Sequence, residues 1–166
     1  MSSAARSAAK VGHVSDSSRP FSARPRCLIG IIREYIGSTR VSLDFQNYEE
    51  ELDGLPGKYA APRGLMLLAW KDGGVVGCGG FREVDARSCE MKRVYVRPEA
   101  RGQQLGRQLM ERILREAKAA GYARICLDVL PEFLAARYLY ESLGFREAEP
   151  VTQNPVPGTH FLGRDL

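Results

Sequence analysis

The segment from residue 90 to 107 constrains the fold most, because it reads as a β-strand, a tight turn and a helix in immediate succession. Val94, Tyr95 and Val96 are β-branched or aromatic and suit a pleated strand, and Pro98, which has no N–H, ends the pairing. Apolar residues then recur at helical spacing, with about 3.6 residues per turn, until Gly121 marks the helix end. They are Leu105, Leu109, Met110, Ile113, Leu114 and Ala117.

The turn between this strand and this helix carries Arg101, Gly102 and Gly106. Glycine lets backbone N–H groups approach a ligand closely, and the positive end of the helix dipole favours negative charge. A diphosphate would therefore fit this turn. An ordinary strand–turn–helix with glycine at the bend has the same composition, so the turn alone leaves both interpretations open.

A second strand and helix follow the first pair. The apolar run at 124–129 predicts a strand. Pro131 suits the first turn of a helix and Gly144 suits its end, so a helix is expected over 131–143. This helix contains the pair Leu-Tyr, ending at Tyr140, and is followed by Gly-Phe at 144 and 145.

The two segments together resemble the acetyl-CoA site of the GNAT acetyltransferase superfamily. Its loop reads Arg or Gln, two residues, Gly, one residue, then Gly or Ala, and Arg101 and Gly106 match. The middle glycine is replaced by Gln104, which can still donate its backbone N–H if its φ stays negative. The family often has Asn where this chain has Phe133, so apolar packing is expected to replace a polar contact with the pantetheine.

The resemblance implies an α/β (α+β), GNAT-like fold. It is a mixed sheet of six to seven strands, with the fourth and fifth splayed apart, flanked by about four helices. Residues 23–166 would form the acetyltransferase domain, after a basic, Ser- and Ala-rich leader at 1–22 that is expected to be flexible apart from a short first strand. An organelle transit peptide has a similar composition. The expected further elements are a first strand around 10–14, helices over 26–37 and 47–52, a hairpin of 65–70 with 75–84, and a terminal strand near 159–163.

By the same resemblance, acetyl-CoA is the co-substrate. The open edge of the fourth strand would pair with the pantetheine arm, and the turn would hold the diphosphate. The expected cofactor-binding residues are Val94, Tyr95, Val96, Arg101, Gly102, Gln103, Gln104, Leu105, Gly106 and Arg107.

Acetyl transfer to an ammonium group requires a base that removes a proton. Glu90 begins the fourth strand, at the position where histone-type members of the superfamily carry their general base. The alternative is that Glu90 only forms a surface ion pair with Lys92 or Arg82. Asp128 and Glu132 are the substitutes, acting through water.

The reaction also requires a donor for the developing oxyanion and an acid for the departing thiolate. Simple alternation places Val94 on the same strand face as Glu90, Lys92 and Val96, and the resemblance implies that the Val94 N–H binds the acetyl carbonyl. Tyr140 would protonate the thiolate, since a phenol with a pKa near ~10 is a plausible donor. A role for Tyr140 in packing alone stays open.

Charge is distributed unevenly along the chain. The first 26 residues hold five basic side chains and one acidic one, which accounts for the whole formal charge of +4. The rest is neutral, which weakens a nucleic-acid-binding interpretation. Residues 92–107 are basic and suit phosphates, whereas residues 27–53 are acidic and suit an amine, although a run such as Glu49–Glu51 is usually a solvated helix face.

The four cysteines have neither paired metal-ligand spacing nor the density of a disulfide scaffold, and His13 and His160 are isolated. We therefore expect no metal and a reducing, cytoplasmic environment. No apolar run approaches the roughly 20 residues that span a bilayer, so no membrane association is expected.

The sequence thus predicts an acetyl-CoA-dependent N-acetyltransferase that acetylates a primary amine by direct transfer in a ternary complex. A non-catalytic acyl-CoA-binding or sensing domain would keep the turn but need neither Glu90 nor Tyr140. The acceptor stays open among a polyamine, an aminoglycoside, a peptide N-terminus and a lysine side chain. A homodimer paired through the terminal strand is also compatible with the sequence.

Overall fold

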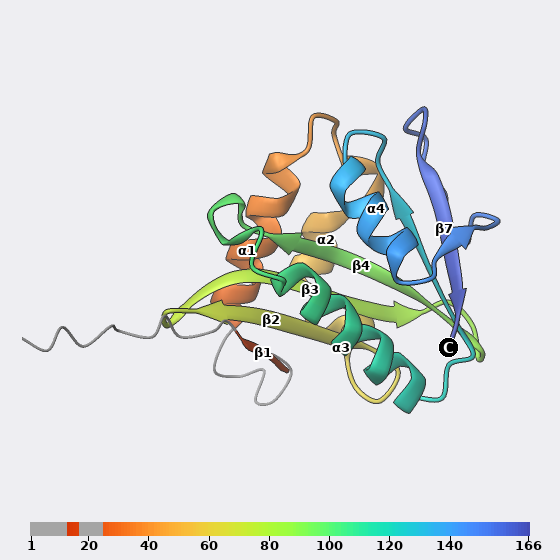
Figure 1. Ribbon diagram of the computed structural model, residues 1–166, viewed down its shortest axis with the longest axis horizontal. Helices are drawn as coiled ribbons and strands as arrows, with labels where there is room; N and C mark the ends of the chain where they lie inside the picture. The colour runs from red at the N-terminus through yellow and green to blue at the C-terminus, as the bar shows by residue number, and fades with distance from the viewer. Residues whose placement is uncertain (1–12, 17–24) are drawn as a thin grey trace, which may run out of the picture.

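The computed structural model describes residues 13–16 and 25–166, and Figure 1 shows how their elements are arranged. In chain order the elements are β1 (His13–Asp16), α1 (Pro25–Ser38), η2 (Asp44–Gln46), α2 (Tyr48–Asp53), η3 (Gly57–Tyr59), β2 (Leu65–Lys71), β3 (Gly74–Glu83), β4 (Ser88–Val96), η4 (Pro98–Ala100), α3 (Leu105–Ala119), β5 (Arg124–Val129), α4 (Leu134–Ser142), β6 (Arg146–Glu147) and β7 (His160–Asp165). Most of the predicted leader at 1–22 lies outside the described residues. The first strand, expected around 10–14, is described at 13–16.

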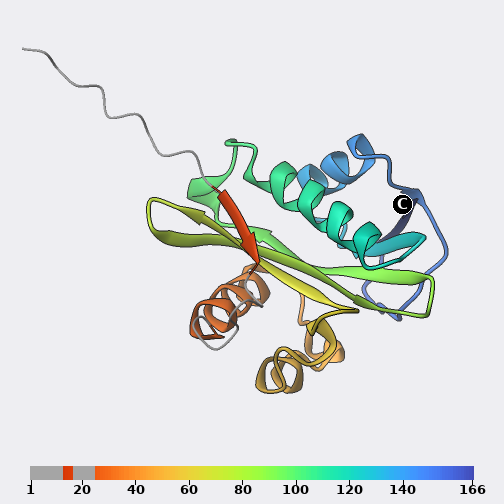
Figure 2. The same cartoon turned by 90° about the horizontal axis from the view of Figure 1, so that it is seen from below.

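The strands form one mixed sheet in the order β1-β2-β3-β4-β5-β7-β6. Neighbouring strands are antiparallel except β4 and β5, which run parallel. Helices α1 and α2 cover one face of the sheet, and α3 and α4 cover the other (Figure 2). The predicted mixed sheet with its four helices is confirmed.

Each face of the sheet has its own core. The predicted apolar stripe of α3 is buried against β2, β3, β4 and β5. On the other face, the apolar side of α1 is buried with α2 against β2 to β4. Each stripe removes its side chains from water only when it faces the sheet. The fully buried large side chains on the two faces include Leu67, Phe81, Leu109, Met110, Ile113 and Phe145 on the α3 side and Leu28, Ile31, Ile32, Tyr59 and Leu68 on the α1 side.

The parallel pair β4 and β5 separates soon after it begins. The two strands pair only at Ser88 with Arg124, Cys89 with Ile125, and Glu90 with Cys126. Beyond Glu90 each strand continues for several residues without the other. The predicted splay of the fourth and fifth strands is therefore present, and it leaves the β4 edge facing β5 free for another hydrogen-bonding partner.

A β-bulge interrupts β4 at Arg93. Lys92 pairs with Gly80 of β3, and Tyr95 pairs with Cys78, so three steps along β4 oppose two steps along β3. Arg93 has a φ of 60°, in the left-handed region. The extra residue shifts the side-chain alternation of the strand from this point onward.

The bulge corrects the predicted arrangement of side chains along β4. Glu90 and Lys92 lie on the α1–α2 side of the sheet, as does the side chain of Arg93, whereas Val94 packs into the core on the α3 side and Val96 lies near Gly106 at the start of α3. The expectation that Glu90 and Lys92 share one face with Val94 and Val96 is wrong, because the sequence gives no sign of the bulge.

Helix α4 begins later than its proline suggested. Pro131 to Phe133 form a turn, in which the Phe133 N–H donates to the Leu130 carbonyl, and the helix runs from Leu134. Phe133 itself has φ −92° and ψ 59°, outside the helical region. This places the Phe133 side chain ahead of the helix, beside the gap between β4 and β5.

Candidate active site

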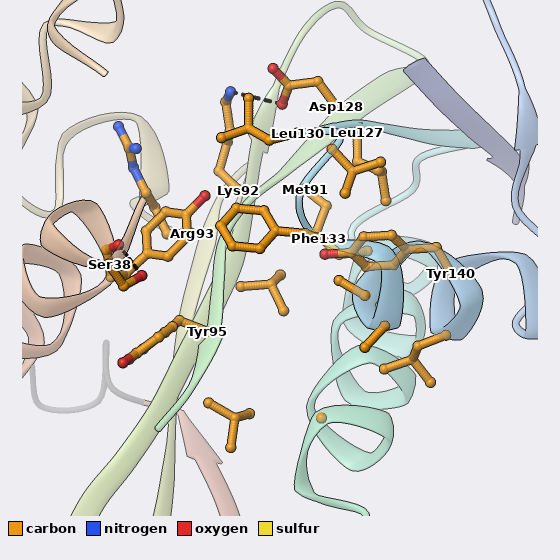
Figure 3. Close-up of a pocket in the computed structure, with 18 of the residues that line it drawn as sticks. Ser38, Met91, Lys92, Arg93, Tyr95, Leu127, Asp128, Leu130, Phe133 and Tyr140 are labelled. Carbon is orange, nitrogen blue, oxygen red and sulfur yellow. Dashed lines mark hydrogen bonds and ion pairs between the residues drawn. The ribbon is translucent and has the colours of Figure 1, made fainter. Parts of the chain in front are cut away.

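A cavity of about 500 Å³ fills the gap between the separated strands. Its walls come from α1, the segment from Leu43 to Gln46, β4, the turn before α3, β5 and α4, together with Asn154 (Figure 3). At one end lies the glycine-containing turn, and at the other end lie Lys92 and Asp128. Tyr140 and Phe133 lie between the two ends.

The N-terminus of α3 opens toward this cavity. Gly102, Gln104, Leu105 and Gly106 all line it. In the described structure no side chain caps α3, so the N–H groups of its first turn are available to a ligand. A Cβ on Gly106 would lie 3.5 Å from the Leu139 side chain, so a larger side chain there would enter the space beside α4.

Gln104 does not meet the condition of a negative φ. Its φ is 64°, so it adopts the left-handed conformation that favours glycine. A non-glycine residue in this conformation costs roughly 1–2 kcal/mol of backbone strain.

The two arginines of the turn have partners on the protein. Arg101 Nε donates to the Val96 carbonyl at 2.9 Å, and its guanidinium lies 5.9 Å from the Tyr95 ring centroid. Arg107 donates to Ser142 Oγ at 2.9 Å. Both side chains line the cavity, as do Val94, Tyr95 and Val96, whereas Gln103 does not. Nine of the ten residues predicted for the cofactor thus converge on one cavity.

Tyr140 lies in the middle of the cavity wall. Its side chain is buried, and its ring packs at an angle of 62° against Phe145. Its hydroxyl points toward Phe133 (Figure 3) and has no hydrogen-bond partner among the described residues. Burial, with the nearby Tyr35 and Asp128, raises the pKa of Tyr140 far above its ordinary value. The phenol therefore stays neutral and keeps its hydroxyl proton.

Glu90 does not line this cavity. It is only 1% exposed, and its carboxylate accepts hydrogen bonds from Arg82 at 3.3 Å and from Thr152 Oγ at 2.8 Å, with Lys92 Nζ at 3.4 Å. With Arg82 and Thr152 it borders a separate hollow of about 580 Å³. Glu90 forms ion pairs with both Lys92 and Arg82, but they are buried, so the expectation of a surface ion pair is wrong in its location.

Asp128 is the carboxylate that the structure places inside the cavity near Tyr140. Its Oδ1 lies 3.3 Å from Lys92 Nζ, and its Oδ2 accepts a hydrogen bond of 2.7 Å from Asn154. Glu132 also lines the cavity, where it accepts from the backbone N–H of Arg40 at 3.2 Å.

Sequence reasoning did not identify Tyr35 or Asn154 as site residues. Tyr35 lies within the predicted helix 26–37, and it lines the cavity. Burial raises its pKa to about 12, with contributions from Asp128 and Glu132. Asn154 lies in the long segment between β6 and β7, and only the folded chain brings it to Asp128. A tyrosine among aliphatic residues was the one available signal for Tyr35.

The acidic residues at 44–53, which make up most of the acidic stretch 27–53 that suggested a cationic acceptor, contribute little negative charge to the cavity. Glu51 pairs with Arg93, and Glu49 pairs with Arg33 at 2.9 Å on the surface. Although burial alone would raise the pKa of Glu51, its contacts with Arg93 lower it below the ordinary value. Of residues 44–53, only Gln46 lines the cavity.

Two general features concern the described residues alone. No group of three or more His, Cys, Asp or Glu side chains within them is arranged to hold a metal ion. None of the helices drawn in the structure is both long enough and apolar enough to cross a membrane.

Comparison with known proteins gives consistent matches. The sequence profile of the acetyltransferase (GNAT) family matches residues 30–145. An uncharacterized N-acetyltransferase of Schizosaccharomyces pombe is 38% identical over 138 residues, covering 82% of this chain and 85% of that protein. An IAA acetyltransferase of Azospirillum brasilense is 37% identical over 109 residues, covering 64% of this chain and 71% of that protein.

Solved structures share the fold. A GNAT family acetyltransferase from Staphylococcus aureus superposes with a TM-score of 0.72 at 21% identity, over 93% of this chain and 98% of that one. One from Elizabethkingia anophelis, with acetyl-CoA bound, gives a TM-score of 0.64 at 17% identity, over 95% and 99%. The family profile, the relatives and the fold agree, and the chain therefore belongs to the GNAT family of N-acetyltransferases.

Proposed function

We propose that this enzyme binds acetyl-CoA and transfers its acetyl group directly to a primary amine in a ternary complex. The observation that carries the proposal is a single cavity with an uncapped helix N-terminus at one end, a carboxylate at the other and a neutral phenol between them. Such an order matches the order of diphosphate, thioester and amine in the reacting complex. Acetyl-CoA bound to the relative from Elizabethkingia anophelis supports the same co-substrate.

The turn and the open edge of β4 bind the co-substrate in this proposal. Backbone N–H groups from Gly102 to Arg107 and the positive end of α3 receive the diphosphate. The pantetheine arm pairs with the β4 edge that β5 leaves free. The Val94 N–H, within this free segment, donates to the acetyl carbonyl and stabilises the oxyanion that develops there.

Direct transfer is supported by the composition of the cavity wall. None of the four cysteines, all of which lie in the described part of the chain, lines the cavity. Ser38, which does, lies on the surface and donates its hydroxyl to the Tyr35 carbonyl. The described cavity wall therefore offers no activated Cys or Ser to carry the acetyl group between two half-reactions.

Asp128 is better placed than Glu90 to accept the amine proton. Its carboxylate lies in the cavity, and the charge of Asp128 is close enough to raise the pKa of Tyr140. Glu90, in contrast, is surrounded by Arg82, Lys92 and Thr152. In this proposal Glu90 is a positioning residue that holds Lys92 against Asp128.

The steps then balance. The ammonium gives a proton to Asp128, and the free amine forms a C–N bond with the thioester carbon. The resulting oxyanion is held by the Val94 N–H, the C–S bond breaks, and the thiolate takes the Tyr140 proton. The nitrogen loses its second proton as the amide forms, and this proton restores the Tyr140 phenol, while Asp128 releases the first proton to water.

Acetyl-CoA should stabilise the folded chain, because only the native turn assembles the anion site. At a concentration about 100-fold above Kd, the stabilisation of ~2.7 kcal/mol should raise Tm by about 5–10 °C. Gly106→Asp should abolish this rise in a thermal-shift measurement by placing a carboxylate beside the diphosphate. Gly30→Asp adds the same charge on the exposed side of α1 and should keep the rise. An unchanged Tm of the native chain in millimolar acetyl-CoA would refute the proposed binding.

Tyr140→Phe should lower kcat by on the order of 10²-fold or more, because the thiolate loses its proton donor. The KM for acetyl-CoA should change little, since the ring and its contact with Phe145 remain. Steady-state kinetics with thiol detection would measure both constants. A kcat equal to that of the native enzyme would mean that Tyr140 only packs.

Asp128→Asn and Glu90→Gln should differ in their pH profiles. The carboxylate base works only when ionised, so kcat/KM of the native enzyme should fall toward acidic pH. Asp128→Asn should lose this acidic limb, and its kcat/KM near neutral pH should be about 10²-fold lower. The remaining activity should rise with the concentration of deprotonated amine in solution. Glu90→Gln should keep the limb and lose less than about fivefold. The reverse pattern would restore Glu90 as the base.

A further inference from the structure

The amine end of the cavity carries charges that are already balanced. It presents Lys92 and Arg93 as cations and Asp128 and Glu132 as anions. Lys92 Nζ lies 3.3 Å from Asp128, and Arg93 is bound to Glu51 and, at 2.7 Å, to Gln46. No carboxylate in this described wall lacks a polar partner from the protein.

Glu132 follows the same pattern. It accepts from the Arg40 N–H at 3.2 Å, and its other oxygen lies 3.7 Å from Arg40 Nε. An acceptor with several ammonium groups would therefore bring positive charge against a wall with no surplus negative charge. Burying such unpaired charge is strongly unfavourable.

The rest of this end is apolar and aromatic. Leu43 and Leu130 are buried, and the Phe133 ring projects into the middle of the cavity (Figure 3). The Tyr35 ring lines the α1 side and packs 5.8 Å from the Tyr95 ring, centroid to centroid. These walls favour a substituent that gains from leaving water.

Tyr35 supplies one polar group that the protein itself does not use. Its hydroxyl has no hydrogen-bond partner among the described residues, and with a pKa raised to about 12 by burial it stays neutral. A neutral phenol can accept a hydrogen bond from an amine that also faces Asp128.

Resting on the proposed acetyl transfer, we propose that the acceptor is a primary amine with a single positive charge and an apolar substituent. Asp128 receives its proton, the Tyr35 hydroxyl accepts a hydrogen bond from its nitrogen, and Phe133 and Leu130 cover its apolar body. Polyamines and aminoglycosides are excluded as preferred acceptors by the balanced charges of the wall.

The test compares hexylamine with hexane-1,6-diamine, which differ only in a second ammonium group, and with butylamine, spermidine and kanamycin. Thiol release from acetyl-CoA gives kcat/KM for each. We expect kcat/KM to rise about threefold per methylene from butylamine to hexylamine, and hexylamine to exceed the diamine at least tenfold. A diamine, spermidine or kanamycin that matches or exceeds hexylamine overturns the proposal, as does acetyl-CoA binding without turnover of either monoamine.

Tyr35→Phe keeps the ring but removes the hydroxyl, and Tyr138→Phe, on the exposed side of α4, is its matched control. Tyr35→Phe should raise the KM for hexylamine about five- to tenfold and leave that for acetyl-CoA unchanged, whereas Tyr138→Phe should change neither. An unchanged KM for hexylamine in Tyr35→Phe overturns the role of this hydroxyl. The thermal shift with acetyl-CoA distinguishes a failure of the proposed function from a failure of the acceptor class. If acetyl-CoA does not raise Tm, the proposed function is refuted. If Tm rises normally but diamines are the preferred acceptors, only the acceptor class is refuted.

Discussion

The separation of β4 from β5 after Glu90 is the constraint on which the rest of the site depends. A paired edge would satisfy the backbone of both strands and leave no space between them. Because pairing stops at Glu90 with Cys126, the gap becomes the cavity, and one edge of β4 remains available to a ligand. The bulge at Arg93 adds to this effect, since it turns Val94 toward the α3 side while Lys92 and Arg93 stay on the other.

Buried charges organise the amine end of this gap. Arg82, Glu90, Lys92 and Asp128 form a continuous series of ion pairs from the second hollow to the cavity. Such groups are costly to bury unless each has a partner, and in this series each one has at least one. Glu90 therefore has a structural reason to be present even if it never touches a substrate. The same balance is what makes a multiply charged acceptor unfavourable.

The fold could be predicted largely from local patterns. The apolar stripe of α3, the run at 124–129 and the glycine-containing turn each specify their own structure, and their order indicated the family. The side-chain arrangement after Lys92 could not be predicted, because a bulge depends on pairing with β3 rather than on the β4 sequence. Tyr35 and Asn154 were missed because each reaches the cavity from a distant segment. The acidic residues at 44–53 suggested a cationic acceptor, but Glu51 forms an ion pair with Arg93 and adds no free negative charge to the cavity.

Hydrogen–deuterium exchange with and without acetyl-CoA tests the central claim most directly, that the turn before α3 and the free edge of β4 form the co-substrate site. The uncapped N–H groups of the turn should exchange rapidly in the free chain and slowly in the complex. We predict protection in peptides spanning residues 94–107, with no change in β2, which pairs with β3 along its length and with β1 over residues 67–70. Unchanged exchange across 94–107 at saturating acetyl-CoA, or protection confined to the hollow beside Glu90 and Thr152, would contradict the account.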